Sequence, residues 1–162
     1  MFGIPVDRAK LRLTLTYAFT ERFSAGIEYN PLGDDVGPLA NLRLIDETRT
    51  RPALLVGTSS DRIGTPDGRA YYATFSKNLQ PLIDLPVAPY AGLAFGEFED
   101  EWRFIGGMRI RYDEKWSSTH LWDGVNLHHL VDRALNDRYR LGFILVEQDG
   151  EYYGGLRLGG SF

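Results

Sequence analysis

The chain has 162 residues, of which 43% are hydrophobic and 13% aromatic, with 18 glycines, no cysteine and a formal net charge of −4. This length suits one domain over residues 1–162. The charge argues against nucleic-acid binding, and the lack of cysteine excludes disulfides, thiolate catalysis and cysteine-ligated metal sites. No apolar run reaches the roughly 18 residues of a membrane-spanning helix, and no signal-peptide pattern opens the chain, so an exported protein would be a mature form or a fragment.

Residues 9–20 introduce the pattern that recurs along the chain, with leucine and aromatic side chains at every second position. A repeat of two predicts a β-strand. Residues 23–29 alternate in the same way after a turn at Glu21-Arg22, which predicts a hairpin. Residues 30–38 contain two prolines, two glycines and two aspartates and predict a loop, followed by a weaker strand over 39–45.

Further alternating or apolar stretches predict six more strands, with a turn-rich loop over 59–68 and a tight turn at Gln148-Asp149-Gly150 between the last two. These strands are expected over residues 52–57, 69–77, 87–98, 102–112, 138–147 and 151–162.

Residues 116–135 allow two interpretations. Val125, Leu127, Leu130, Val131 and Leu135 have the spacing of a short helical stripe, whereas Asp123-Gly124 has the composition of a hairpin turn. The helix gives about ten strands and the hairpin about eleven. Because bacterial single-chain barrels have even strand numbers, we expect ten.

The arrangement along each alternating stripe favours lipid over a soluble core. In residues 102–112 aromatic side chains stand at the ends of the apolar stripe and Gly106 and Met108 in its middle, as in a barrel with aromatic girdles. The sequence therefore predicts an all-β fold, an antiparallel up-and-down transmembrane β-barrel of about ten strands, within a range of eight to twelve. Residues 23–29 and 39–45 are short for this fold, since spanning strands need about nine to eleven residues.

Arginines dominate the polar face of the predicted strands. If the first and last strands pair, Arg12 and Arg157 lie near each other inside the barrel. Enclosed guanidinium groups need carboxylate partners, such as Glu28 and Glu97, or an anionic ligand. The interior is therefore either filled by ion-paired side chains or open as a path for anionic solutes or sugar acids. We favour the ion-paired interior. The candidate interior binding residues are Arg12, Glu28, Arg103, Arg109, Arg111, Arg140 and Arg157.

Three histidines and two serines are the remaining candidates for chemistry. His128 and His129 are adjacent and therefore point to opposite faces, which disfavours a shared metal ion. Ser117 or Ser118 with His120 would make a Ser/His arrangement, but their spacing alone does not support one. We expect no catalytic residue, no metal and no cofactor.

Two segments resemble known outer-membrane proteins. The ending EYYGGLRLGGSF (151–162) resembles the C-terminal signature that the barrel-assembly machinery reads. Residues 51–77 resemble a segment of the YjbH-type outer-membrane proteins linked to exopolysaccharide production, and Trp122-Asp123-Gly124-Val125-Asn126 is similar to another turn of that family. The positions that match within 51–77 are Pro52, Gly57, Asp61, Gly64, Thr65, Tyr72, Ser76 and Lys77. The resemblance covers a minor part of the chain and implies a role connected with polysaccharide.

The expected function follows from the predicted barrel and from this resemblance. The chain is expected to be a porin-like, non-enzymatic protein of the bacterial outer membrane that serves as a scaffold, an anchor or a path for a small solute or polysaccharide. Outer-membrane lipids are its expected partners, with other envelope proteins and an anionic polysaccharide as further candidates. The alternatives are a soluble β-barrel that binds a small apolar ligand and a lipid-modifying outer-membrane enzyme.

Overall fold

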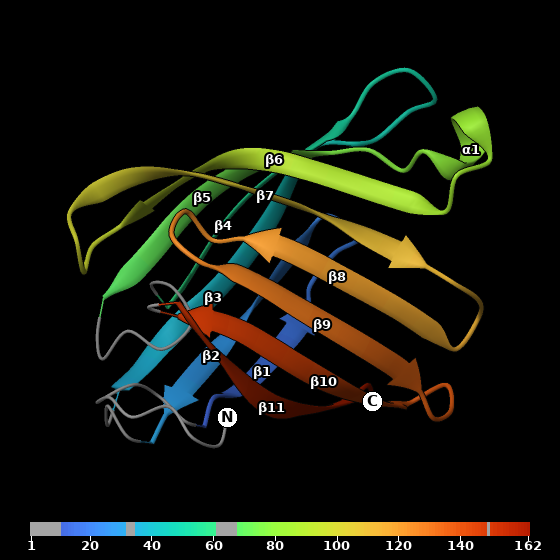
Figure 1. Cartoon of the computed structure of the whole chain (residues 1–162). Coiled ribbons are helices and arrows are strands. Elements are labelled where there is room, and N and C mark those ends of the chain that lie inside the picture. Colours follow the sequence, from blue (N-terminus) through green and yellow to red (C-terminus); the bar gives the residue numbers. More distant parts are fainter. Residues whose placement is uncertain (1–10, 32–34, 61–67, 149) are drawn as a thin grey trace.

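The structure is a computed structural model that describes residues 11–31, 35–60, 68–148 and 150–162. All strands in these ranges form one up-and-down antiparallel sheet of 11 strands, paired in chain order. Figure 1 shows the sheet strongly curved, with β6 and β7 at the top, β8–β11 in front and β1–β4 behind. The strands are β1 (Leu13–Ala18), β2 (Phe23–Asn30), β3 (Asp35–Ile45), β4 (Ala53–Ser60), β5 (Arg69–Ser76), β6 (Val87–Gly96), β7 (Glu101–Arg111), β8 (Trp116–Trp122), β9 (Leu127–Ala134), β10 (Tyr139–Gln148) and β11 (Glu151–Gly160).

One helix of a single turn, α1 (Gln80–Ile83), lies between β5 and β6. It was not predicted from the sequence. It ends at Asp84, whose φ of 53° is left-handed and stops the helix. Within the ranges described, no helix is both long enough and apolar enough to cross a membrane.

The segment 116–135 forms the hairpin β8–β9, so the second of the two interpretations is correct. The sheet has 11 strands, which is one more than the ten expected and within the predicted range of eight to twelve. Asp123 accepts hydrogen bonds from the backbone N–H groups of Val125 and Asn126 at 2.8 and 2.7 Å, and Gly124 has a φ of 102°. These contacts stabilise a tight turn. The strand register then places Leu127 and Val131 on one face and Leu130 on the other, so the helical spacing of these residues is coincidental.

The predicted loop 30–38 is shorter than expected, because residues 35–38 belong to β3. Pro38 pairs with Ile27 and Val36 with Tyr29, which extends the outward apolar row. This extension brings β3 to 11 residues, while β2 has 8. The loop predicted over 59–68 also loses Ser59 and Ser60 to β4, and its residues 61–67 lie outside the described part.

The described sheet is open, so the expectation of a closed barrel is not confirmed. β1 and β11 are its two edges and do not pair with each other. Because the number of consecutive antiparallel strands is odd, β1 and β11 run in the same direction. These two strands therefore cannot pair with each other in the antiparallel way that would close the sheet. Arg12 and Arg157 are consequently not brought together by strand pairing.

The two faces of the sheet differ sharply in side-chain chemistry. Leu13, Phe104 and Leu158 lie on the outer face and are 51%, 62% and 76% exposed. The opposite, inner face carries Glu28 and His128, both 1% exposed. Among the described residues the buried apolar side chains are Leu39, Ala53, Ala70 and Val146, a set too small for the core of a soluble domain of this size.

Aromatic side chains stand at the ends of the outer rows. Strand β7 carries Trp102 at its start and Tyr112 just after its end, and β8 begins with Trp116 and ends with Trp122. Rings also cluster where strands turn, since the centroids of Phe95 and Trp102 are 5.5 Å apart. In the outer rows of β6 and β7, alanine, leucine, glycine and methionine lie between the rings, an arrangement expected of aromatic girdles.

Candidate functional site

All seven predicted interior residues lie on the inner face, but they form two chemically different groups. Three of the arginines have carboxylate partners. Arg12 pairs with Glu28 and donates from Nε to Oε2 at 2.7 Å. Arg103 pairs with Glu99 and Glu101 at 2.9 and 2.7 Å, and Arg157 lies 3.9 Å from the carboxylate of Asp132. These pairs agree with the ion-paired part of the expected interior.

Glu97, predicted as a partner for the arginines, has other contacts. Its carboxylate accepts hydrogen bonds from the Tyr71 hydroxyl and from the backbone N–H of Arg69, each at 3.0 Å. Glu97 therefore braces the β6–β7 connection against β5.

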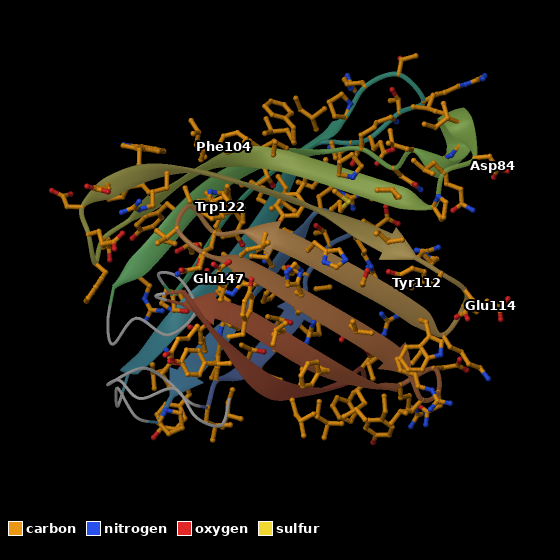
Figure 2. The ribbon with its side chains drawn as sticks, viewed as in Figure 1. Asp84, Phe104, Tyr112, Glu114, Trp122 and Glu147 are labelled. Atoms are coloured by element: carbon orange, nitrogen blue, oxygen red, sulfur yellow. The ribbon has the colours of Figure 1, made fainter. Side chains whose placement is uncertain are left out.

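The second group is a basic mouth, defined here as Arg109, Arg111 and Arg140. These side chains line one cavity of about 650 Å³ at the end of the sheet where β7 turns into β8. Within the described residues none of the three has an ion pair, and Arg109 makes only a long hydrogen bond of 3.4 Å to Ser117 Oγ. Asp84, Asp113 and Glu114 line the same cavity, and Figure 2 shows Asp84 and Glu114 at this end of the sheet.

A second inner cavity of about 360 Å³ lies toward the opposite end of the strands. Tyr72 and Tyr90 line it together with the paired Arg12 and Arg103. The Tyr72 hydroxyl donates to Asn41 Oδ1 at 2.7 Å, which fixes the ring against β3. The two cavities give the inner face one ion-paired end and one basic end.

The β8–β9 turn is held by a buried contact between Asp123 and His128. His128 Nε2 donates to Asp123 Oδ2 at 2.6 Å. Burial acts to raise the pKa of the Asp123 carboxyl, but the hydrogen bonds from His128 and from the backbone of Asn126 and Val125 outweigh burial and hold that pKa below its ordinary value. Asp123 is therefore an ionised brace for the turn.

An additional cluster, which we call the outer polar cluster, consists of Tyr112, Ser118, His120 and His129. The Tyr112 hydroxyl is 2.9 Å from Ser118 Oγ, which is 3.1 Å from His120 Nε2. The Nδ1 atoms of His120 and His129 are 2.7 Å apart, across the β8–β9 pair. The register places the cluster on the outer face, since Met108 pairs with His120 and Leu145 with His129.

The structure selects between the serines that the sequence left open. Ser117 points to the inner face beside Arg109, and Ser118 points outward to His120. His128 and His129 point to opposite faces, as expected. In the described part of the chain, no group of three or more His, Asp or Glu side chains is arranged to hold a metal ion.

Comparison of the chain with protein-family models, with curated proteins and with solved structures found no match. The similarity to YjbH-type proteins therefore stays a prediction. Three of the positions that carry it, Asp61, Gly64 and Thr65, lie outside the described residues.

Proposed function

We propose that this chain is a β-barrel-type protein of the bacterial outer membrane, which acts as an envelope scaffold or anchor and provides a path for small anionic solutes or an anionic polysaccharide. The observation that carries the proposal is the inverted distribution of side chains. Large apolar groups cover the outer face between rows of aromatic residues, while charged groups and buried Glu28 and His128 occupy the inner face. Hydrocarbon outside and polar groups inside are the solvation that such a sheet requires.

Tryptophan fluorescence provides a direct test, because the chain's three tryptophans, Trp102, Trp116 and Trp122, all lie on the outer face near strand ends. We expect lipids brominated near the headgroup to quench their emission strongly when the protein is reconstituted in vesicles. Lipids brominated near the end of the acyl chain should quench less, since aromatic residues prefer the interface.

The soluble alternative makes the opposite prediction for these experiments. A soluble β-barrel with an apolar ligand would be folded and monodisperse in buffer without detergent, and its tryptophans would be insensitive to brominated lipid. Either result would refute the membrane proposal.

The basic mouth supports the anionic path. The lining of its cavity carries four cations, the three arginines and Lys115, against the carboxylates of Asp84, Asp113 and Glu114. None of the three arginines has an ion pair within the described residues, so their guanidinium groups are available to bind an anion at close range, with an attraction that salt weakens. The double variant Arg111→Ala/Arg140→Ala is expected to slow the uptake of a small sugar acid into proteoliposomes at low salt. Arg49→Ala is the matched control, since Arg49 lies in the exposed β3–β4 loop at the same end and does not line the cavity. Equal uptake by both variants would exclude the mouth from the path.

A further inference from the structure

We infer that the outer polar cluster is a catalytic site that hydrolyses the carboxylic esters of membrane phospholipids. This inference rests on the proposed function, because it requires the outer face to contact lipid. It also departs from the expectation that the chain has no catalytic residue.

The position of the cluster is the first reason. Polar groups facing hydrocarbon are costly unless they are hydrogen-bonded, and ionisable residues within a membrane usually serve a function. Here two imidazoles and a serine occupy adjacent outward positions that are apolar on neighbouring strands, such as Met108 and Leu145. A row of apolar residues would fulfil a purely structural role better.

The hydrogen-bond order is the second reason, because it matches a nucleophile, a base and a group that orients the base. Ser118 Oγ is 3.1 Å from His120 Nε2, so this nitrogen is placed to take the hydroxyl proton. For Nε2 to accept, His120 must carry its proton on Nδ1 and donate it to Nδ1 of His129, 2.7 Å away. His129 is therefore a positioning residue that fixes the tautomer of His120.

Access to the nucleophile is controlled by Tyr112. Ser118 is 2% exposed, and the hydroxyl of Tyr112, a residue that is itself 61% exposed, lies 2.9 Å from Ser118 Oγ. Tyr112 follows the last residue of β7, so its ring can turn outward without disturbing the sheet.

The depth of the cluster matches a phospholipid. Trp116, the first residue of β8, belongs to the aromatic level at the headgroups, and the guanidinium of Arg133 lies 5.3 Å from its ring centroid. Ser118 is one outward position further along β8, about 7 Å along the strand and about 5 Å closer to the hydrocarbon at a tilt of about 40°. This order places Arg133 near a lipid phosphate and Ser118 near the acyl ester of the same molecule.

The reaction follows from these positions. Ser118 Oγ bonds to the ester carbonyl carbon while its proton moves to His120 Nε2, and the carbonyl oxygen becomes an oxyanion. The intermediate collapses as the bond from the carbonyl carbon to the glycerol oxygen breaks, and His120 returns the proton to that oxygen. Water, deprotonated by His120, then adds to the acyl carbon. The bond from this carbon to Ser118 Oγ breaks, His120 returns the proton to Oγ, and the fatty acid leaves.

The test uses the full chain in detergent micelles with a fluorophosphonate probe, followed by peptide mass spectrometry. We expect covalent labelling of Ser118 and hydrolysis of fluorogenic phosphatidylglycerol. His120→Ala should lower hydrolysis by about 10²-fold or more, and Ser118→Ala should remove the labelling. Thr119→Ala is the matched control, because Thr119 lies between the two on the opposite face and should leave both readouts unchanged.

Two further variants separate catalysis from a structural role. His129→Ala should shift the pH–rate profile of hydrolysis, and His129→Asn, whose amide oxygen can still accept from His120, should restore the profile. Arg133→Gln should slow hydrolysis of phosphatidylglycerol but not of diacylglycerol.

A protein that is folded and micelle-bound, yet unlabelled at Ser118 and inactive on both lipids, overturns this inference and leaves the proposed function intact. A protein that is folded and monodisperse without detergent overturns both.

Discussion

Leu156→Arg provides the sharpest test of whether the outer face contacts lipid. Leu156 is 66% exposed on the outer face of β11, opposite Phe143. Tyr152 and Phe162 bound this outer row, and the hydrogen bond from Ser161 to Arg138 O continues the strand pairing toward its end. The ten residue steps between the two rings span about 34 Å along the strand.

The depth of Leu156 follows from this geometry. At a strand tilt of about 40°, the distance between the rings corresponds to about 26 Å along the membrane normal, close to the apolar band of about 25 Å in outer-membrane barrels. Leu156 is four steps from Tyr152 and thus about 10 Å below the aromatic level, near the middle of the band.

Leu156→Arg should lower the free energy of unfolding by a large amount only if the outer face contacts lipid. An arginine near the midplane destabilises a membrane barrel by about 2–4 kcal/mol, whereas an exposed substitution on a soluble protein changes stability by about 0.5 kcal/mol or less. Urea unfolding in phospholipid vesicles, followed by tryptophan fluorescence, measures the difference. Tyr152→Arg, at the interface, is the control, with an expected cost of about 0–1 kcal/mol. A cost below about 0.5 kcal/mol for Leu156→Arg would refute the reasoning.

Three further predictions concern the inner face and its turns. Arg12→Met leaves the Glu28 carboxylate, which is 1% exposed, without its ion-pair partner. This variant should lower the free energy of unfolding, measured with urea, by about 3–5 kcal/mol. Glu28→Gln leaves Arg12 without its partner, but Arg12 is 38% exposed and stays hydrated, so the free energy of unfolding should fall by only about 1 kcal/mol. Equal losses of stability in the two variants would contradict this reasoning. Because the pKa of Asp123 is depressed in the folded protein, its stabilisation of the β8–β9 turn is present above its ordinary pKa of about 3.9 and is lost as the pH falls through the lower, folded value. Hydrogen exchange at the N–H of Val125 and Asn126 should therefore speed up at low pH, beyond the intrinsic change, in the unmodified protein but not in Asp123→Asn. Arg140→Ala alone should weaken the binding of an anionic oligosaccharide at low salt more than at high salt, as measured by titration calorimetry, and an equal loss at both salt concentrations would contradict an electrostatic role.

Strand positions were predictable from the sequence because a repeat of two is a local signal. Leu13, Leu15 and Tyr17 identify β1 without any knowledge of its partner. The β8–β9 hairpin remained one of two interpretations because Leu127, Leu130 and Val131 also fit a helical spacing. The choice depends on the hydrogen bonds that Asp123 makes in three dimensions.

The outer polar cluster shows which information was missing. Ser118 and His120 share a face in any strand, so their proximity was within reach of the sequence. The pairing of His120 with His129 requires the turn at 123–126, which sets the register of the two strands. The basic mouth was even harder to predict from the sequence. Arg140 lines the same cavity as Arg109 and Arg111 only because of the order of β7 to β10 and the curvature of the sheet.

The two parallel-running edges have a consequence for insertion into a bilayer. Each edge strand presents a row of backbone N–H and C=O groups that hydrocarbon is unable to hydrate, at a cost of several kcal/mol per group. Stable insertion is thus thermodynamically coupled to the pairing of both edge strands with other backbone.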